Sequence, residues 1–187
     1  LGFEHACALF SKEVPDRSNS VICWGSNSYG QIGDENSIYS NYKMVESDLK
    51  WEKISSGGFH NCGVSNGSAY CWGNGELGQI GVFGASSSVP KKINFAEGDY
   101  IIDIGSGSFH SCGLTVRNTV YCWGWNGLGQ LGSGNYQNSD IPIKVQLPDL
   151  GRINKLNVGD THNCVESYTG EIFCWGDNGY GQILDNN

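Results

Sequence analysis

The sequence repeats one short motif four times. Each copy begins with Cys-Trp-Gly and continues, seven residues after the cysteine, with Gly-Gln and then Ile or Leu. The steps between successive copies are 48, 51 and 52 residues. Self-similarity at such a period indicates one supersecondary unit that is repeated in a propeller or a solenoid. The motif cysteines are Cys23, Cys71, Cys122 and Cys174.

We therefore expect one repeat domain over the 187 residues, with units of about 1–50, 51–101, 102–153 and 154–187. A net charge of −8 argues against a nucleic-acid surface, which needs clustered Lys and Arg. Because no run of about eighteen apolar residues occurs, we expect no membrane insertion. The chain begins at Leu1 and not at Met, so we expect a mature product or a piece of a longer protein.

A second motif, His-x-Cys, lies upstream of each Cys-Trp-Gly. Apolar residues alternate with polar ones over short runs such as Ile102 to Ile104 and Leu156 to Val158, and Gly, Asn and Ser bound these runs. This pattern is typical of β-strands, and no segment shows a helical period, so the chain is expected to be all-β. The histidine and cysteine pairs are His5 and Cys7, His60 and Cys62, His110 and Cys112, and His162 and Cys164.

The turn chemistry predicts which cysteines face each other. A two-residue turn at Asn66 and Gly67 needs φ > 0 at both positions, which these residues tolerate. This turn aligns Cys62 with Cys71. Three-residue loops that end in Asn118 and Gly170 align Cys112 with Cys122 and Cys164 with Cys174 in the same way. The first hairpin has a longer tip, Ser11 to Ser20, and the pair Cys7–Cys23 follows by analogy.

Opposed Cβ atoms in a hairpin are close enough for a disulfide with some local twist. Four disulfides within hairpins would place the chain in an oxidising, extracellular compartment. Zinc binding and free thiols are the alternatives. Each His-x-Cys and its opposed Cys offer three ligands at most, and no Cys-x-x-Cys occurs, so we expect no metal.

The return strand before each Cys-Trp-Gly is apolar on both faces: Tyr70 and Trp72 share one face, and Ala69 and Cys71 the other. Such a strand is buried on both sides, as stacked blades provide. The whole pattern, from His-x-Cys through Cys-Trp-Gly to Gly-Gln-[Leu/Ile]-Gly, resembles the repeat of the regulator of chromosome condensation (RCC1) family, in the cysteine-bearing form of secreted proteins. The resemblance implies a β-propeller of antiparallel blades, of which this chain would form a partial or open array.

Three departures from the family pattern affect the prediction. Gly75 replaces the asparagine found at Asn27, Asn126 and Asn178, so we expect that loop to be altered, and Leu184 replaces a glycine of the motif. The family typically has seven blades, whereas this chain has four repeats. The chain holds four hairpins but three of the strand segments that follow them, so its ends could join copies head to tail in a filament.

The residues that recur in every repeat are interpreted as structural. We expect each histidine to be buried and bonded to backbone of the next loop, each tryptophan to lie in the core, and each glutamine to satisfy loop backbone groups. No nucleophile–base constellation, phosphate loop or cofactor motif occurs, and acidic residues such as Asp34, Glu35, Glu76, Asp177 and Asp185 are scattered. We therefore expect no enzyme and no cofactor. The tryptophans are Trp24, Trp72, Trp123 and Trp175, and the glutamines are Gln31, Gln79, Gln130 and Gln182.

Two features point to the surface. Asn66 lies in an Asn-Gly-Ser glycosylation sequon at a hairpin tip, although it also has a full explanation as a turn residue. The variable loops 34–47, 82–91 and 133–141 are the expected partner-binding surface, because repeat proteins recognise partners through loops on one face. Their aromatic residues could anchor a partner: Tyr39, Tyr42, Phe83 and Tyr136.

The sequence favours a non-catalytic, extracellular repeat module that acts as a structural or protein-interaction scaffold, with a filament or matrix subunit as a variant. A secreted ligand-binding ectodomain or enzyme inhibitor is the alternative. The family resemblance also implies a guanine-nucleotide exchange factor, because the founding member acts on a small GTPase. Paired cysteines in every repeat argue against that role, since it needs a reducing compartment. The expected partners are proteins, including further copies of the chain.

Overall fold

The computed structural model describes residues 1–10, 18–45, 47–96 and 98–183. These residues form fourteen β-strands and no helix, so none of the described part could cross a membrane as a helix. Every paired strand is antiparallel to its neighbour. The prediction of an all-β chain is confirmed.

The strands form four sheets, which we call blades 1 to 4 in chain order. Blades 2 and 3 have four strands, and blades 1 and 4 have three among the described residues. Blade 1 is β1 (His5–Leu9), β2 (Val21–Ser26) and β3 (Tyr39–Met44); blade 2 is β4 (Trp51–Ser56), β5 (His60–Ser65), β6 (Ser68–Gly73) and β7 (Ser87–Lys92); blade 3 is β8 (Ile101–Ser106), β9 (His110–Thr115), β10 (Val120–Gly124) and β11 (Ser139–Lys144); blade 4 is β12 (Ile153–Val158), β13 (His162–Ser167) and β14 (Ile172–Gly176).

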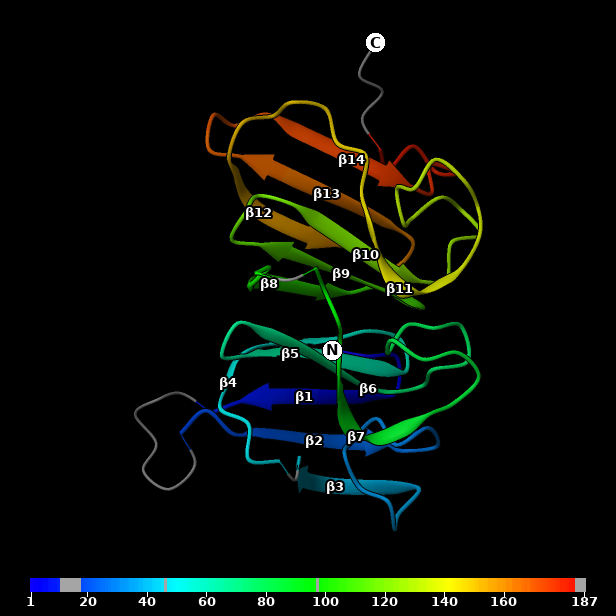
Figure 1. The fold of residues 1–187 in the computed structure, drawn as a ribbon. Helices are drawn as coiled ribbons and strands as arrows, with labels where there is room; N and C mark the ends of the chain where they lie inside the picture. Colours follow the sequence, from blue (N-terminus) through cyan, green and yellow to red (C-terminus); the bar gives the residue numbers. More distant parts are fainter. Residues whose placement is uncertain (11–17, 46, 97, 184–187) are drawn as a thin grey trace.

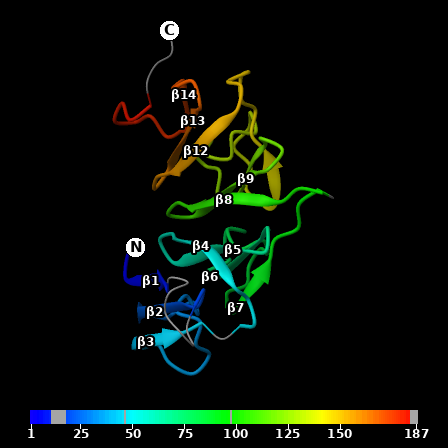
Figure 2. The same cartoon turned by 90° about the vertical axis from the view of Figure 1, so that its left-hand side faces the viewer.

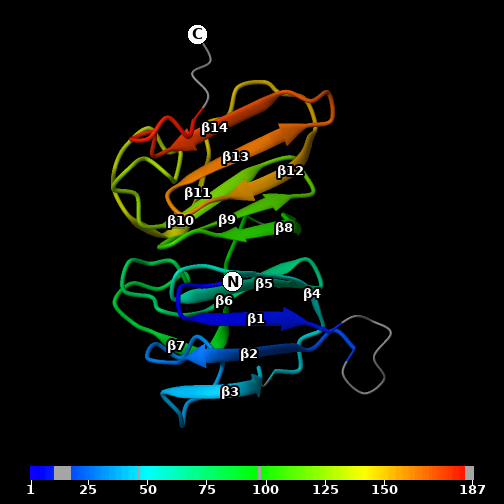
Figure 3. The ribbon, with the colours of Figure 1, turned by 180° about the vertical axis from the view of Figure 1, so that it is seen from behind.

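The blades follow one another from β3 at one end of the molecule to β14 at the other (Figure 1 and, from behind, Figure 3). Their first strands are in contact in sequence order: β1 with β4, β4 with β8, and β8 with β12. In Figure 2 the strands β4, β8 and β12 lie one above another. Blades 1 and 4 occupy opposite ends, so the array is an open propeller, as the four-repeat sequence predicted.

The hairpin turns adopt the predicted conformations. Asn66 and Gly67 have φ values of 47° and 68°, as a two-residue turn of this type requires. Asn118 and Gly170, the last residues of the three-residue loops, have φ values of 65° and 89°. Loop residues 11–17 of the first hairpin, within the tip Ser11 to Ser20, lie outside the described residues.

All four turns bring two cysteines directly opposite each other, and each pair forms a disulfide with a Cα–Cα distance of 4.1 Å. The described residues hold no free cysteine. The prediction of one disulfide in each hairpin is confirmed, and the alternatives of a zinc site and free thiols do not hold in this structure. The pairs are Cys7–Cys23, Cys62–Cys71, Cys112–Cys122 and Cys164–Cys174.

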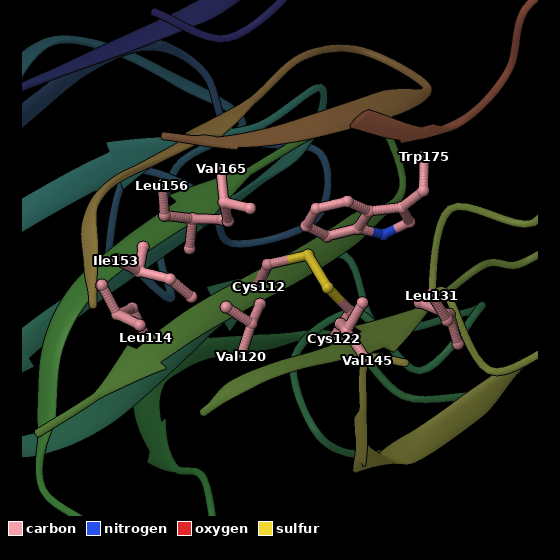
Figure 4. Packing of buried hydrophobic residues seen from close by; sticks show 10 residues of the cluster. All are labelled: Cys112, Leu114, Val120, Cys122, Leu131, Val145, Ile153, Leu156, Val165 and Trp175. Atoms are coloured by element: carbon pink, nitrogen blue, oxygen red, sulfur yellow. A yellow bond between two sulfur atoms is a disulfide. The ribbon is translucent and has the colours of Figure 1, made fainter. Parts of the chain in front are cut away.

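The hydrophobic core is divided into three clusters, one between each pair of neighbouring blades. Figure 4 shows the cluster between blades 3 and 4, in which Trp175 of blade 4 approaches the Cys112–Cys122 disulfide of blade 3. Because every interior blade contributes to two clusters, its central strand is buried on both faces: every residue of β5 and β9 is buried. In the terminal blades, β1 and β13 are only partly buried.

We call the end of the sheets that carries the Gly-Gln loops the loop end, and the opposite end, with the hairpin tips, the tip end. The loops of blades 2 and 3 form the right-hand edge of the molecule in Figure 1. The register fixes this polarity, because each repeated histidine pairs with the glycine of Cys-Trp-Gly at the loop end, as His60 does with Gly73.

Candidate functional site

A tight turn precedes each repeated histidine. In the sequence Gly-x-x-His, the glycine N–H donates to the histidine carbonyl three residues later, for example Gly57 to His60 at 2.8 Å. A Cβ added at Gly57 would lie 2.5 Å from Cε1 of the imidazole and 2.3 Å from the Gly107 carbonyl oxygen of the next blade. Glycine is therefore required both for the ring and for the close approach of two blades. The glycines are Gly2, Gly57, Gly107 and Gly159.

Each of the first three histidines bonds across to the following blade. His5 Nε2 lies 2.9 Å from Asn61 Oδ1, His60 Nε2 lies 2.8 Å from Ser111 Oγ, and His110 Nε2 lies 2.8 Å from Asn163 Oδ1. The acceptor is in each case the residue directly after the next histidine. The prediction that the histidines bond to the backbone of the next loop was wrong. Their bonds join side chains of different repeats.

Each acceptor residue also donates a hydrogen bond to the blade that carries the histidine. Asn61 Nδ2 donates to the Gln31 carbonyl at 2.6 Å, and the corresponding bonds from Ser111 Oγ to Gln79 and from Asn163 Nδ2 to Gln130 are 3.0 and 2.8 Å. The same carbonyls accept from the indole N–H of the next tryptophan, all at 3.0 Å: Trp72 on Gln31, Trp123 on Gln79 and Trp175 on Gln130. One polar unit thus recurs at all three interfaces between blades.

This network keeps the interior histidines neutral. Burial lowers the pKa of His60 from 6.5 to about 3 and that of His110 to about 4, and neighbouring histidines lower both pKa values further. Burial also lowers the pKa of His5. Because each Nε2 carries the hydrogen that the acceptor requires, a second proton would go to Nδ1, which is buried without a hydrogen-bond partner in all three rings. The chemistry is that of a structural link between blades.

The tryptophans follow the position of their blade. Trp72, Trp123 and Trp175 are buried between blades, as predicted. The prediction was wrong for Trp24, which is 37% exposed because blade 1 has no preceding blade in the described structure. Blade 1 also differs at the acceptor position, where Ala6 stands in place of Asn or Ser. The end of the array therefore lacks part of the polar unit.

The glutamine side chains hold their own loops. Each Oε1 accepts from the backbone N–H two residues earlier, at 2.9 or 3.0 Å, in all four repeats. Asn27, Asn126 and Asn178 support the same loops by accepting from the N–H five residues later. In the second repeat, Gln79 Nε2 bonds to Asn74 Oδ1 at 3.0 Å, one position before Gly75. A Cβ at Gly75 would lie 1.9 Å from the Ala85 carbonyl oxygen, so asparagine does not fit there.

The acidic residues named from the sequence, as far as the structure describes them, do not gather into a metal site. No group of three His, Cys, Asp or Glu side chains suited to a metal occurs in the part of the chain that the structure describes. Asp34 bonds Ser37 and the N–H of Asn36, and these bonds lower the pKa of its carboxyl. Asp177 likewise accepts from the N–H of Gly179, which lowers its pKa. Leu184 and Asp185 lie outside the described residues.

The surface features occupy both ends of the sheets. Asn66 is exposed at its hairpin tip, and its N–H donates to Glu52 Oε1 at 2.8 Å. The aromatic residues expected to anchor a partner are all exposed: Tyr39, Tyr42, Phe83 and Tyr136. A further group of aromatic rings lies at the loop end, where Phe3, Phe59 and Phe109 contact one another with centroids 5.4 to 6.5 Å apart.

Sequence reasoning missed three features of this arrangement. It missed the residue after each histidine, the glycine three residues before it, and the phenylalanine that lies directly before it in the second and third repeats and two residues before it in the first. The aligned strings Gly-Phe-Glu-His, Gly-Gly-Phe-His, Gly-Ser-Phe-His and Gly-Asp-Thr-His hold the signal for the last two features. The partner of each histidine lies some fifty residues away, and only the arrangement of the blades brings the two together.

Two family models, both described as the regulator of chromosome condensation (RCC1) repeat, match the chain. One matches residues 66–114 and 117–165, and the other matches residues 101–130 and 153–182. Together they cover more than half of the sequence. The matches begin in the second hairpin and extend through blades 3 and 4.

Two relatives are similar to almost the whole of this chain. A probable E3 ubiquitin-protein ligase HERC6 from Homo sapiens is 30% identical over 97% of this chain and 18% of its own length. The ultraviolet-B receptor UVR8 from Arabidopsis thaliana is 27% identical over 97% of this chain and 41% of its own length. This chain thus spans less than half of each of these relatives.

Solved structures share the fold at 24% identity. Human WBSCR16 superposes with a TM-score of 0.80 over 94% of this chain and 45% of its own. Yeast RCC1 (Prp20), solved bound to Kap60, gives 0.77 over 93% and 40%. The ectodomain of the Physcomitrella patens receptor kinase CR4 gives 0.61 over 100% and 41%. On the family models, the repeat spacing and the blade architecture, the chain belongs to the RCC1 repeat family.

Proposed function

We propose that this chain is a non-catalytic, extracellular repeat module that serves as a scaffold for binding other proteins. The observation that carries the proposal is the disulfide at the same position of every blade. Disulfides persist in oxidising compartments and are rare where glutathione keeps thiols reduced. Four disulfides in 187 residues, with no free cysteine in the described ranges, support an extracellular location.

The scaffold role rests on how the repeated residues are used. The histidines, tryptophans and glutamines that recur in all repeats are engaged in loops and in the interfaces between blades, which leaves the loops and their exposed aromatic residues for recognition. Protein binding by this fold has precedent in yeast RCC1, whose structure was solved bound to Kap60.

A secreted ligand-binding ectodomain or enzyme inhibitor is the alternative form of the proposal. The fold likeness to the CR4 receptor-kinase ectodomain, which extends over the whole chain, favours the ectodomain. Guanine-nucleotide exchange on a small GTPase has the least support, because a reducing compartment would oppose the four disulfides. A head-to-tail filament is a variant of the scaffold proposal, and it would require blade 4 of one copy to join blade 1 of the next.

The compartment is tested by the redox state of the protein from its natural source. Cells or medium would be quenched with an alkylating reagent, and the mass of the denatured, unreduced chain would be measured. We expect no alkylated cysteine in the extracellular fraction and eight only after reduction. A natural pool with eight alkylated cysteines before reduction would refute the extracellular assignment.

The scaffold role is tested separately. The disulfide-bonded chain on beads would be incubated with the extracellular fraction of its source, and retained proteins would be identified and then purified. We expect at least one purified partner to bind the chain directly. The mass of this partner should be unchanged after incubation with the chain. Modification or cleavage of that partner on incubation would contradict a non-catalytic role.

A further inference from the structure

A strip of aromatic side chains crosses the loop end. Tyr29, Phe3, Phe59, Phe109 and Trp125 are linked by ring contacts: Tyr29 to Phe59 at 5.5 Å, Phe59 to Phe3 at 5.4 Å, Phe59 to Phe109 at 6.3 Å and Phe109 to Trp125 at 6.3 Å. We call these five residues the aromatic strip. Phe3 is 54% exposed and the other four are half-buried, so the strip is partly accessible to solvent.

The position of the strip follows from the repeat. Phe59 and Phe109 directly precede repeated histidines, and Phe3 lies two residues before His5. Tyr29 and Trp125 belong to the loops that follow Cys-Trp-Gly. Backbone bonds between blades hold this region, including Phe3 N–H to the Gly58 carbonyl at 3.1 Å and Ser108 N–H to the Asp160 carbonyl at 2.9 Å. The rings are therefore presented by a rigid part of the fold.

A shallow hollow of about 200 Å³ adjoins the strip. Phe3, Gly57, Gly107 and Asp160 are among the residues that line it, and the glycines expose backbone there. The hollow thus joins an aromatic ring from blade 1 to an acidic residue from blade 4. A bound segment could contact the rings and this carboxylate together.

Charge is distributed unevenly between the two ends of the sheets. Among the described residues, the loop end carries seven acidic residues, which are Glu4, Asp34, Glu35, Glu76, Asp140, Asp160 and Asp177. Every described Lys and Arg lies at the level of the disulfides or nearer the tip end, as Lys53, Lys91 and Lys144 do in the strand registers. Lys43 reaches from that level to Asp34, at 3.9 Å. The loop end is therefore the acidic end of the molecule.

Aromatic faces attract cations through their quadrupole, and the planar guanidinium of arginine stacks on them better than the ammonium of lysine. We propose that the loop end binds an arginine-rich segment of a partner protein, whose guanidinium groups stack on the aromatic strip while the surrounding carboxylates neutralise their charge. This inference rests on the proposed protein-binding function and specifies its site and the chemistry of its partner.

The test measures fluorescence anisotropy of a labelled peptide of five Gly-Arg repeats on the disulfide-bonded chain. We expect the Gly-Arg peptide to bind more tightly than a Gly-Lys peptide of the same length, and a Gly-Glu peptide not to bind. Raising the salt from about 50 mM to about 300 mM should weaken binding, because exposed charges are screened over a shorter distance. No binding of Gly-Arg, or equal binding of all three peptides, would overturn the proposal.

Two variants locate the site. Phe3→Leu keeps an apolar side chain but removes the ring, and we expect it to weaken Gly-Arg binding about twofold to fivefold, the range of one solvent-accessible cation–π contact. Asp160→Asn should weaken binding to a similar degree. The matched controls at the tip end are Tyr168→Leu, which also removes an exposed ring, and Glu171→Gln. If all four variants bind as the wild type does, the loop end is not the site.

The outcome separates this inference from the proposed function. A natural partner that binds wild type and Phe3→Leu equally would leave the scaffold function standing and reject the loop end as its site. If the tip end of a second copy covers the loop end, light scattering would show a dimer, and Asp160→Asn would dissociate it. That result would replace the arginine-rich partner by the chain itself and would overturn the proposal.

Discussion

Glycine three residues before each histidine is required by side-chain packing and not by backbone conformation. We expect Gly107→Ala to destabilise the chain by about 2–3 kcal/mol, because its Cβ would lie 2.2 Å from Cε1 of His110 and 2.6 Å from the Gly159 carbonyl oxygen. Gly113→Ala is the matched control, since it is buried in the same blade but its Cβ would meet Ile101 at an ordinary 3.5 Å. We expect its stability to lie within about 1 kcal/mol of wild type. Urea unfolding of the oxidised proteins makes the comparison, and equal losses would contradict it.

The buried histidines make the fold sensitive to mild acid. The pKa values of His60 and His110 are lower in the folded chain, about 3 and 4, than the ordinary 6.5, so the unfolded chain binds more protons below pH 6.5. Their contribution to stability is therefore intact above pH 6.5 and falls by about 1.4 kcal/mol per pH unit for each histidine as the pH drops toward 4. Asp34 and Asp177, whose pKa values are lowered, add losses only below about pH 4.

The variant His60→Gln tests the assignment, because an amide can donate to Ser111 without titrating. Between pH 7 and pH 5 we expect the wild type to lose on the order of 4 kcal/mol of unfolding free energy through the two histidines, and the variant to lose about half as much. Urea unfolding at each pH gives both values. The same pH dependence in wild type and variant would mean that His60 is not the titrating group.

At the scale of the hairpin, the disulfides of blades 3 and 4 separate two sources of stability. Cys112–Cys122 and Cys164–Cys174 close loops of the same length, ten residues apart in sequence, so the chain-entropy model assigns both about 2–3 kcal/mol. The first is fully buried in the cluster between blades 3 and 4, and the second is half-buried in the terminal blade. We expect replacement of both cysteines by alanine to cost more in blade 3, where the lost sulfur atoms also leave a cavity.

Hydrogen exchange measured separately on β9 and β13 would report the local unfolding of blades 3 and 4. Separate measurements are needed because repeat arrays need not unfold as one unit. In each double variant, exchange should accelerate in the blade that lost its disulfide, and the increase should be larger in β9. Equal increases in both blades would mean that the disulfides act on the unfolded chain alone and that their burial contributes nothing to stability.

How far the sequence predicts the structure depends on the range of the interaction. The hairpin registers were predictable because local turn residues such as Asn66 and Gly67 set them, and the disulfides follow from the register. The bonds of His60 to Ser111 and of Trp72 to the Gln31 carbonyl were not, since they join residues 51 and 41 positions apart. Both depend on which faces of two blades meet, and a local pattern of apolar residues leaves that choice open.

At the scale of the whole molecule, the two end blades carry unequal halves of the interface that joins the interior blades. Blade 4 presents His162, and blade 1 presents Trp24 beside Ala6, its partner in the strand register. At the three interior interfaces the position of Ala6 is filled by Asn61, Ser111 or Asn163. A second copy docked head to tail would therefore bury the Nε2–H of one histidine without an acceptor, at a cost of about 1–3 kcal/mol.

We therefore predict that the wild-type chain stays near its monomer mass of 20.3 kDa and that Ala6→Ser promotes head-to-tail association. Serine is the smallest residue used at this position, in Ser111, and it would supply the missing acceptor. Removal of the 1–3 kcal/mol penalty corresponds to association about 5- to 150-fold tighter. Ala6→Val adds volume without an acceptor and should remain monomeric in light scattering. Long assemblies of the wild type would show that the acceptor is dispensable and that the filament needs no change at Ala6, whereas monomeric Ala6→Ser would show that the end blades do not join as the interior ones do.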